Sequence, residues 1–297
     1  MFDTSPQLDC AGRLLKLDVP RVMGIINATP DSFSDGGEHA TVEAAIAHGL
    51  ALAGEGADIL DVGGESTRSG AEDVPLEEEL RRVIPVIQAL ARRVSIPISI
   101  DTSKPEVMRA AVEAGAGMIN DVFGLRREGA LDAAAALGVP VVLMHMQGEP
   151  RTMQANPGYD DVVGEVHRFL AERIFMAEMA GIAKKKIVVD PGFGFGKDTR
   201  HNLQLLAQLQ RFTELGVPVL AGLSRKKTIG ELTGRDDPRE RIFGSVAAHL
   251  VAAQRGAMLL RVHDVAATVD ALKVWNAVSA VPAPRVDAKP VIAWPDD

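Results

Sequence analysis

Polar side chains follow several apolar segments of this sequence, at the points where those segments end. Asp101, Asn120 and Asp190 each close an apolar run, and Lys226 lies just past another. Buried charged and amide groups need partners, so four such residues that converge on one site suggest a polar, planar ligand. A single aspartate at a strand end is more often a helix N-cap, but capping does not explain all four together.

A second set of residues has the chemistry of a phosphate site. Arg68, Arg261 and His263 offer cationic donors suited to phosphate oxygens, and Arg261 and His263 lie two apart, on one face of a strand. Asn27 and the acidic loop 31–35 offer the oxygen ligands that Mg²⁺ accepts alongside phosphate. Polar residues and paired glycines in the stretch MGIINATPDSFSDGG indicate a mobile loop after a buried strand, although a plain solvated turn is the alternative.

Other kinds of catalytic site lack their sequence signals. There is no HExxH, CxxC or GxSxG pattern, which argues against a zinc site, a redox site and a serine nucleophile. The segment Gly192 to Lys197, GFGFGK, lacks Walker A spacing; its glycines would let the backbone approach a ligand while Phe193 or Phe195 packs on it. His145 has the opposite parity to Met144 and is expected to be structural.

These residues must be positioned by alternating strands and helices. Eight apolar runs alternate with helical patterns, which predicts a closed parallel (β/α)8 TIM barrel with the site at the C-terminal strand ends. An open doubly wound sheet is the alternative, and the absence of GxGxxG after the first strand counts against it. The predicted strands are 22–27, 59–62, 98–101, 118–122, 141–146, 187–190, 219–223 and 259–263. Examples of the predicted helices are 42–54, 76–93, 105–114, 129–137, 159–180, 202–215 and 240–255.

The ends of the chain differ from the central region. Two short alternating runs in residues 1–20 predict an N-terminal β-hairpin that could plug one end of the barrel. The barrel is expected to occupy residues 21–280, and the Pro-rich residues 281–297 are expected to form an extended tail.

Composition limits the partners and the compartment. The net charge of −8 argues against nucleic acid or an anionic membrane surface, although a locally basic site is compatible with it. The lone Cys10 fits a reducing cytosol, and the first twenty residues show no signal peptide. The longest uncharged apolar stretch, 242–254, is too short to span a bilayer. We therefore expect a soluble, cytoplasmic protein.

Seven motifs in order closely resemble those of the dihydropteroate synthase family, and the similarity runs from about Arg21 to about Ala277. They are MGIINATPDSFSDGG, DVGGESTR, SIDTSK, MINDV, VVDPGFGFGK, GLSRK and RVHD. The resemblance implies a transferase of folate biosynthesis that joins 6-hydroxymethyl-7,8-dihydropterin diphosphate to p-aminobenzoate and releases pyrophosphate. It also implies a Mg²⁺ cofactor, a family of enzymes that sulfonamides target, and a homodimer formed through late-barrel helices.

The resemblance also implies residue roles, with no residue acting as a nucleophile. The pterin would be held by Asp101, Asn120, Asp190 and Lys226, with Met144 and Phe195 against its faces. Asn27 would ligate Mg²⁺. Electrostatic catalysis would fall to Lys226, Arg261 and His263. The diphosphate and the aminobenzoate would be served by Thr67, Arg68, Arg261 and His263, and the aminobenzoate side would be completed by Ser224 and Arg225.

One departure from the family pattern and two other functions stay open. The family commonly has proline where this chain has Ser69, which would free the backbone there and alter aminobenzoate or sulfonamide contacts. A pterin-binding module of a corrinoid methyltransferase would share the pterin contacts, but it would not need the SFSDGG loop or the Arg-x-His pair. A phosphate-binding barrel lyase would need a Schiff-base lysine inside a strand, whereas Lys226 lies just past one.

Overall fold

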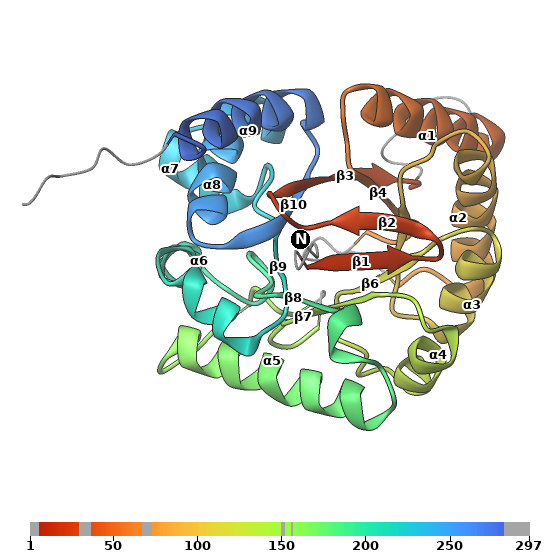
Figure 1. Cartoon of the computed structure of the whole chain (residues 1–297), viewed down its shortest axis with the longest axis horizontal. Coiled ribbons are helices and arrows are strands. Elements are labelled where there is room, and N and C mark those ends of the chain that lie inside the picture. Colours follow the sequence, from red (N-terminus) through yellow and green to blue (C-terminus); the bar gives the residue numbers. More distant parts are fainter. Residues whose placement is uncertain (1–5, 30–36, 67–72, 150–151, 156, 282–297) are drawn as a thin grey trace, which may run out of the picture.

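The computed structural model describes residues 6–29, 37–66, 73–149, 152–155 and 157–281, and for residues 37–41 it describes the backbone alone. Parallel strands form a closed barrel in the order β10-β3-β4-β5-β6-β7-β8-β9, surrounded by helices (Figure 1). The closed barrel confirms the predicted fold class and excludes the open sheet. The strands are β3 (Arg21–Asn27), β4 (Ile59–Gly63), β5 (Ile98–Asp101), β6 (Met118–Asp121), β7 (Val141–Met144), β8 (Ile187–Asp190), β9 (Val219–Ala221) and β10 (Ala257–Val262).

The helices follow the strands in the chain and cover the outside of the barrel. Apolar side chains on the outer strand faces pack with them in one continuous core that includes Val22, Ile26 and Leu60. The helices are α1 (Gly37–Gly54), α2 (Leu76–Ala91), α3 (Pro105–Glu113), α4 (Ala130–Leu137), α5 (Val162–Met179), α6 (Thr199–Ala207), α7 (Lys227–Thr233), α8 (Ile242–Gln254) and α9 (Val265–Ser279). Among the described residues, no helix is both long enough and apolar enough to cross a membrane.

The helix expected over 202–215 is interrupted, and this part of the prediction is wrong. Helix α6 ends at Ala207, and the chain continues from Leu209 to Leu215 as a 3₁₀ helix. Side chains three apart share a face in a 3₁₀ helix, so Leu209 and Phe212 point inward together, and both are fully buried.

The N-terminal hairpin lies across one end of the barrel. It consists of β1 (Gln7–Cys10) and β2 (Arg13–Lys16), and Figure 1 shows it over the centre of the ring of helices. Its side chains Leu8 and Leu15 join a buried cluster with inward-facing residues from the beginnings of the barrel strands, among them Met23 and Ile59. The hairpin therefore covers the N-terminal end of the barrel, so the C-terminal strand ends form the other end.

Candidate active site

The second layer of inward-facing side chains is charged. Ile59, Met118, Val188 and Leu259 form the apolar layer beneath the hairpin. Because residues two apart on a strand share a face, the next inward positions are Asp61 (β4), Asn120 (β6), Asp190 (β8) and Arg261 (β10). The barrel thus brings the predicted Asn120, Asp190 and Arg261 together and adds Asp61, which was not predicted.

Arg261 connects two carboxylates across the barrel. Its Nε donates to Oδ2 of Asp61 over 2.6 Å, and its Nη2 donates to Oδ2 of Asp101 over 2.7 Å. Nδ2 of Asn120 donates to the same Oδ2 of Asp61 over 3.0 Å. Two nitrogens of Arg261 are therefore bound by protein carboxylates, so this arginine organises the interior in addition to any contact with a ligand.

Burial and neighbouring charge oppose each other in this network. Burial raises the pKa of Asp101 to about 7, with Arg261 lowering it and Asp61 raising it further. For Arg261, burial alone would lower the pKa, but the carboxylates of Asp61 and Asp101 outweigh burial and raise it. The guanidinium therefore stays charged and holds the two carboxylates.

Asp61 leaves one acceptor atom without a partner. The residue is fully buried, and its Oδ1 has no hydrogen-bond partner among the described residues. An unsatisfied buried carboxylate oxygen is costly, so this atom is suited to a donor on a bound ligand. Sequence reasoning missed Asp61, although this residue is the first of the motif DVGGESTR. The sequence did contain a signal: Asp61 is a charged residue inside an apolar strand, and it lies two residues from Ile59, on the same face of the strand.

Asp190 and Lys226 provide a second pair of opposite charges. Oδ1 of Asp190 accepts the Gly192 N–H over 2.7 Å, and the side chain of Asp190 is almost fully buried. Burial raises the pKa of Asp190, against the Gly192 hydrogen bond and the charge of Lys226, which lower it. Burial lowers the pKa of Lys226 to about 8, with Asp190 opposing that shift.

One side of this polar cluster is apolar. Met144 and Phe195 belong to a cluster with Val122, Met146 and Met153, and Nζ of Lys226 lies 4.1 Å from the centre of the Phe195 ring. Phe193 packs instead in the core outside the barrel. Of the two phenylalanines left open by the sequence, Phe195 is therefore the one that faces the site.

Ser224, Arg225 and His263 meet at the end of the last two strands. Oγ of Ser224 accepts the backbone N–H of His263 over 3.1 Å and lies 3.0 Å from Nδ1 of the same residue. The guanidinium of Arg225 donates to both oxygens of Asp264, over 3.0 and 2.5 Å. The structure thus brings Ser224 and His263 together and holds Arg225 in an ion pair with Asp264.

Helix α8 supports this segment from behind. Nε2 of the buried His249 accepts the Leu223 N–H over 3.2 Å, and Oγ of Ser245 accepts the Arg225 N–H over 2.9 Å. Arg225 has a positive φ of 57°, a conformation that non-glycine residues adopt rarely and that needs such support.

Asn27 is compatible with a magnesium site. It ends β3 at the inward parity of Met23, and within the described part of the chain its side chain makes no hydrogen bond. Mg²⁺ commonly keeps several waters and binds one or two protein oxygens together with substrate phosphates, so a single amide oxygen fits that role. The loop 31–35 and the predicted residues Thr67, Arg68 and Ser69 lie outside the described residues.

The described groups select a particular kind of ligand. Asp61, Asp101 and Asp190 supply acceptors, Lys226 and Asn120 supply donors, and Phe195 with Met144 supplies an apolar surface. Such a site suits a flat heterocycle that has several N–H donors and ring acceptors.

Comparison with known proteins agrees with this chemistry. A family model described as pterin binding enzyme matches residues 23–263. Dihydropteroate synthase of Escherichia coli (strain K12) is 53% identical over 271 residues, which is 91% of this chain and 96% of that protein.

Solved structures agree as well. A Xanthomonas albilineans dihydropteroate synthase with 4-aminobenzoic acid is 73% identical, with a TM-score of 0.90, over 94% of this chain and 100% of that chain. A structure of the enzyme from the same organism in complex with 7,8-dihydropteroate is 70% identical, with a TM-score of 0.86, over 93% of this chain and 100% of that chain. Similarity at this level over nearly the whole chain excludes the corrinoid-module and lyase alternatives. This chain belongs to the dihydropteroate synthase family of pterin-binding enzymes.

Proposed function

We propose that this protein condenses 6-hydroxymethyl-7,8-dihydropterin diphosphate with p-aminobenzoate to give 7,8-dihydropteroate and pyrophosphate. The observation that carries the proposal is the group of buried Asp61, Asn120 and Asp190 with the partly buried Arg261, at the open end of a barrel that matches this family. Together with Asp101 and Lys226, these side chains match the donors and acceptors of a pterin.

The pterin would be bound by its polar edge and by its faces. Asp190 would accept the neighbouring N–H groups of the amino-pyrimidinone, and the unpartnered Oδ1 of Asp61 would accept another ring donor. Lys226 would donate to ring acceptors. Met144 and Phe195 would contact the faces of the ring system.

The reaction needs positioning and charge neutralisation more than covalent catalysis. The C–O bond between the pterin methylene and the diphosphate breaks, the aniline nitrogen forms the new C–N bond, and that nitrogen then loses a proton. His263 and Arg68 would bind the leaving diphosphate, and Arg261 would hold Asp61 and Asp101 beside it. Mg²⁺, held by Asn27 and the diphosphate, would supply additional charge neutralisation.

The test is product formation in wild type and Asp190→Ala, each with Mg²⁺ and after its removal by EDTA. We expect dihydropteroate to form only with Mg²⁺ and to be lost in Asp190→Ala. Asp132→Ala, which changes an exposed aspartate at the start of α4, is the matched control and should retain activity. A wild-type protein that binds the pterin but makes no product would contradict the proposal.

We also propose a homodimer formed through the late helices. On α8 the Phe243 side chain is 87% exposed, and on α9 Val274 and Val278 are 66% and 68% exposed. Large exposed apolar side chains on neighbouring helices are suited to a second copy of the chain. Sedimentation should give a dimer mass for wild type and a monomer mass for Phe243→Glu.

A cytoplasmic location remains our expectation, which cell fractionation would test.

A further inference from the structure

Lys197 is a buried lysine for which the proposed reaction provides no role. Its side chain is 2% exposed, and in the described part of the chain no carboxylate forms an ion pair with it, although the charge of Asp190 acts on it from a distance. Burying an amine without a carboxylate partner is costly, and burial lowers the pKa of Lys197 well below its usual range.

The partners of the lysine nitrogen belong to the turn that faces the site. Nζ lies 2.9 Å from the carbonyl oxygen of Gly192, 2.9 Å from that of Phe195, and 2.9 Å from Nδ1 of His145. The two carbonyl oxygens can only accept, so each takes an N–H of Lys197, while Nδ1 of His145 pairs with Nζ in the role set by the imidazole tautomer. Lys197 thus joins the turn 192–195 after β8 to His145 at the end of β7.

The same turn carries groups that contact the site directly. The two residues whose carbonyls bind Lys197 also contact the site. The Gly192 N–H donates to Asp190, and the Phe195 ring packs beside Nζ of Lys226. The backbone cannot relax freely, because a Cβ at Gly192 would lie 1.9 Å from the carbonyl oxygen of His145, and Gly192 has a positive φ of 70°. The position of the turn is therefore coupled to the position of these contacts.

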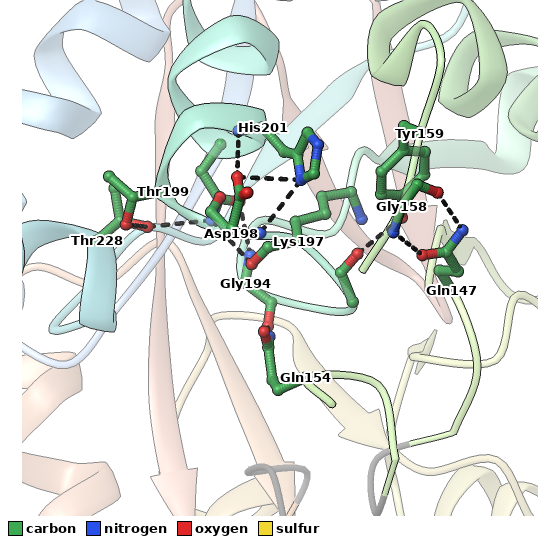
Figure 2. A network of polar contacts seen from close by, with 12 residues as sticks. Gln147, Gln154, Gly158, Tyr159, Gly194, Lys197, Asp198, Thr199, His201 and Thr228 are labelled. Atoms are coloured by element: carbon green, nitrogen blue, oxygen red, sulfur yellow. Dashed lines mark hydrogen bonds and ion pairs between the residues drawn. The ribbon is translucent and has the colours of Figure 1, made fainter. Parts of the chain in front are cut away.

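Other side-chain bonds hold the outer side of the segment, and within the turn the Gly192 carbonyl also accepts the Phe195 backbone N–H over 3.1 Å. Figure 2 shows Gln154 on the Gly194 carbonyl and Tyr159 beside the segment; the Tyr159 hydroxyl donates to the Gly196 carbonyl over 2.8 Å. Oδ1 of Asn202 accepts the Gly194 N–H over 2.8 Å. Among the described residues, Lys197 is the side chain that binds the carbonyls of Gly192 and Phe195, so it ties the inner side of the turn to His145.

We propose that Lys197 is a positioning residue for the pterin: by binding the carbonyls of Gly192 and Phe195, it sets the Phe195 ring and the Gly192 N–H against the ligand and Asp190. The inference rests on the proposed function. It assigns Lys197 no contact with either substrate.

The test replaces Lys197 with methionine, which keeps the length of the side chain and removes its donors. We expect KM for the dihydropterin diphosphate to rise about tenfold, because groups that orient a ligand must be held within about 0.5 Å. KM for p-aminobenzoate should stay within about twofold of wild type, since the turn faces the pterin. Lys186→Met is the matched control: Lys186 also donates to a glycine carbonyl, but it lies before β8, at the opposite end of that strand.

A double-mutant cycle separates positioning from general destabilisation. If Lys197 acts through Phe195, Lys197→Met should weaken binding of 6-hydroxymethylpterin much less in a Phe195→Ala background than in wild type. Additive effects, or an equal rise of both KM values, would contradict the inference.

A second pair of variants serves if Lys197→Met does not fold. His145→Leu removes the polar partner of Nζ and should reproduce part of the rise in pterin KM, whereas His145→Asn keeps a polar group near the position of Nδ1 and should restore binding. Equal pterin KM values in both variants would overturn the inference.

The same measurements separate this inference from the proposed function. If wild type makes product and pterin KM is unchanged in the variants, only the inference fails. If wild type makes no product, the proposed function itself fails.

Discussion

Nε of Arg261 lies 2.6 Å from Oδ2 of Asp61, which joins the last strand of the barrel to its second strand, 200 residues earlier in the chain. The contact is buried on the Asp61 side, and the same arginine also holds Asp101. Removing one partner of a buried ion pair leaves the other charge uncompensated. The pair is therefore expected to be more sensitive to substitution than a surface ion pair.

Asp61→Asn should abolish most activity. The substitution keeps the shape of the side chain but removes the charge that faces Arg261 and the acceptor available at Oδ1. We expect kcat/KM for the dihydropterin diphosphate to fall about 100-fold, which corresponds to about 2.7 kcal/mol. Steady-state kinetics measures this. Asp58→Asn is the control, because Asp58 lies before the same strand at the other end of the barrel; equal losses in both variants would refute a specific role for Asp61.

The contact between Asp61 and Arg261 also shows where sequence reasoning succeeded and where it did not. Strands β5 and β8 end at Asp101 and Asp190 as predicted, because an apolar run followed by one charged residue and a turn is a local signal. Asp61 was missed because its importance depends on a partner 200 residues away. Side-chain parity places it inward, but parity alone does not reveal the partner.

Lys197 and helix α6 show the same limit. The sequence indicated that the glycines of 192–197 approach something closely, but it could not show that the lysine folds back onto its own turn, because that depends on His145 from the previous strand. The end of α6 at Ala207 likewise depends on the burial of Leu209 and Phe212 against the rest of the core. Local patterns predicted the elements, and contacts between distant segments decided the details.

Activity should fall at alkaline pH as Lys226 loses its proton. Its pKa is lowered to about 8 by burial, partly opposed by Asp190, so the charged form disappears as the pH rises through about 8. We expect kcat/KM for the dihydropterin diphosphate to decline above that pH and Lys226→Met to lack this decline. Lys227→Met, which changes the neighbouring lysine with its 88% exposed side chain, should keep the wild-type profile. A flat wild-type profile up to pH 9.5 would rule out the charged form as the active one.

Stability should move in the opposite direction over the same range. The folded pKa of Lys226 lies below its ordinary value of 10.5, so between about pH 8 and 10.5 the unfolded chain binds the extra proton. Stability rises with pH where the unfolded state binds more protons, and the cost of burying the charged form is fully present below about pH 8. Urea unfolding at several pH values should show this rise in wild type and its absence in Lys226→Met.

Ser224 should control the tautomer of His263. The hydroxyl accepts the His263 backbone N–H, so its own proton can go to Nδ1, which leaves the ring proton on Nε2 as a donor. Losing this bond in Ser224→Ala should lower kcat/KM about threefold to tenfold, the range expected for one hydrogen bond. Ser224→Thr keeps the hydroxyl and should retain most activity; a threonine variant as impaired as the alanine variant would point to crowding instead.

Asn27 should set the apparent affinity for Mg²⁺. Asn27→Ala removes the amide oxygen that we assign to the metal, so the Mg²⁺ concentration for half-maximal rate should rise about tenfold. High Mg²⁺ should restore the rate. Asn27→Asp supplies a charged oxygen instead and should lower the half-maximal concentration. Mg²⁺ titrations of the initial rate measure both, and an unchanged titration in Asn27→Ala would remove Asn27 from the metal site.

The hairpin should contribute stability without affecting catalysis. Leu8 is buried with Met23 and Ile59 at the N-terminal end of the barrel, away from the carboxyl ends of the strands that hold Asp101 and Asp190. Leu8→Ala leaves a cavity there and should lower the free energy of unfolding by about 2–5 kcal/mol in urea titrations.

Leu14→Ala is the control within the same hairpin, since Leu14 is 60% exposed and its truncation creates no cavity. Both variants should keep wild-type KM values under conditions where they are folded, because the charged layer of the barrel is separated from the hairpin by the apolar layer. A change of KM in Leu8→Ala alone would mean that packing beneath this apolar layer alters the positions of Asp61 and Arg261. The two ends of the barrel would then be mechanically coupled.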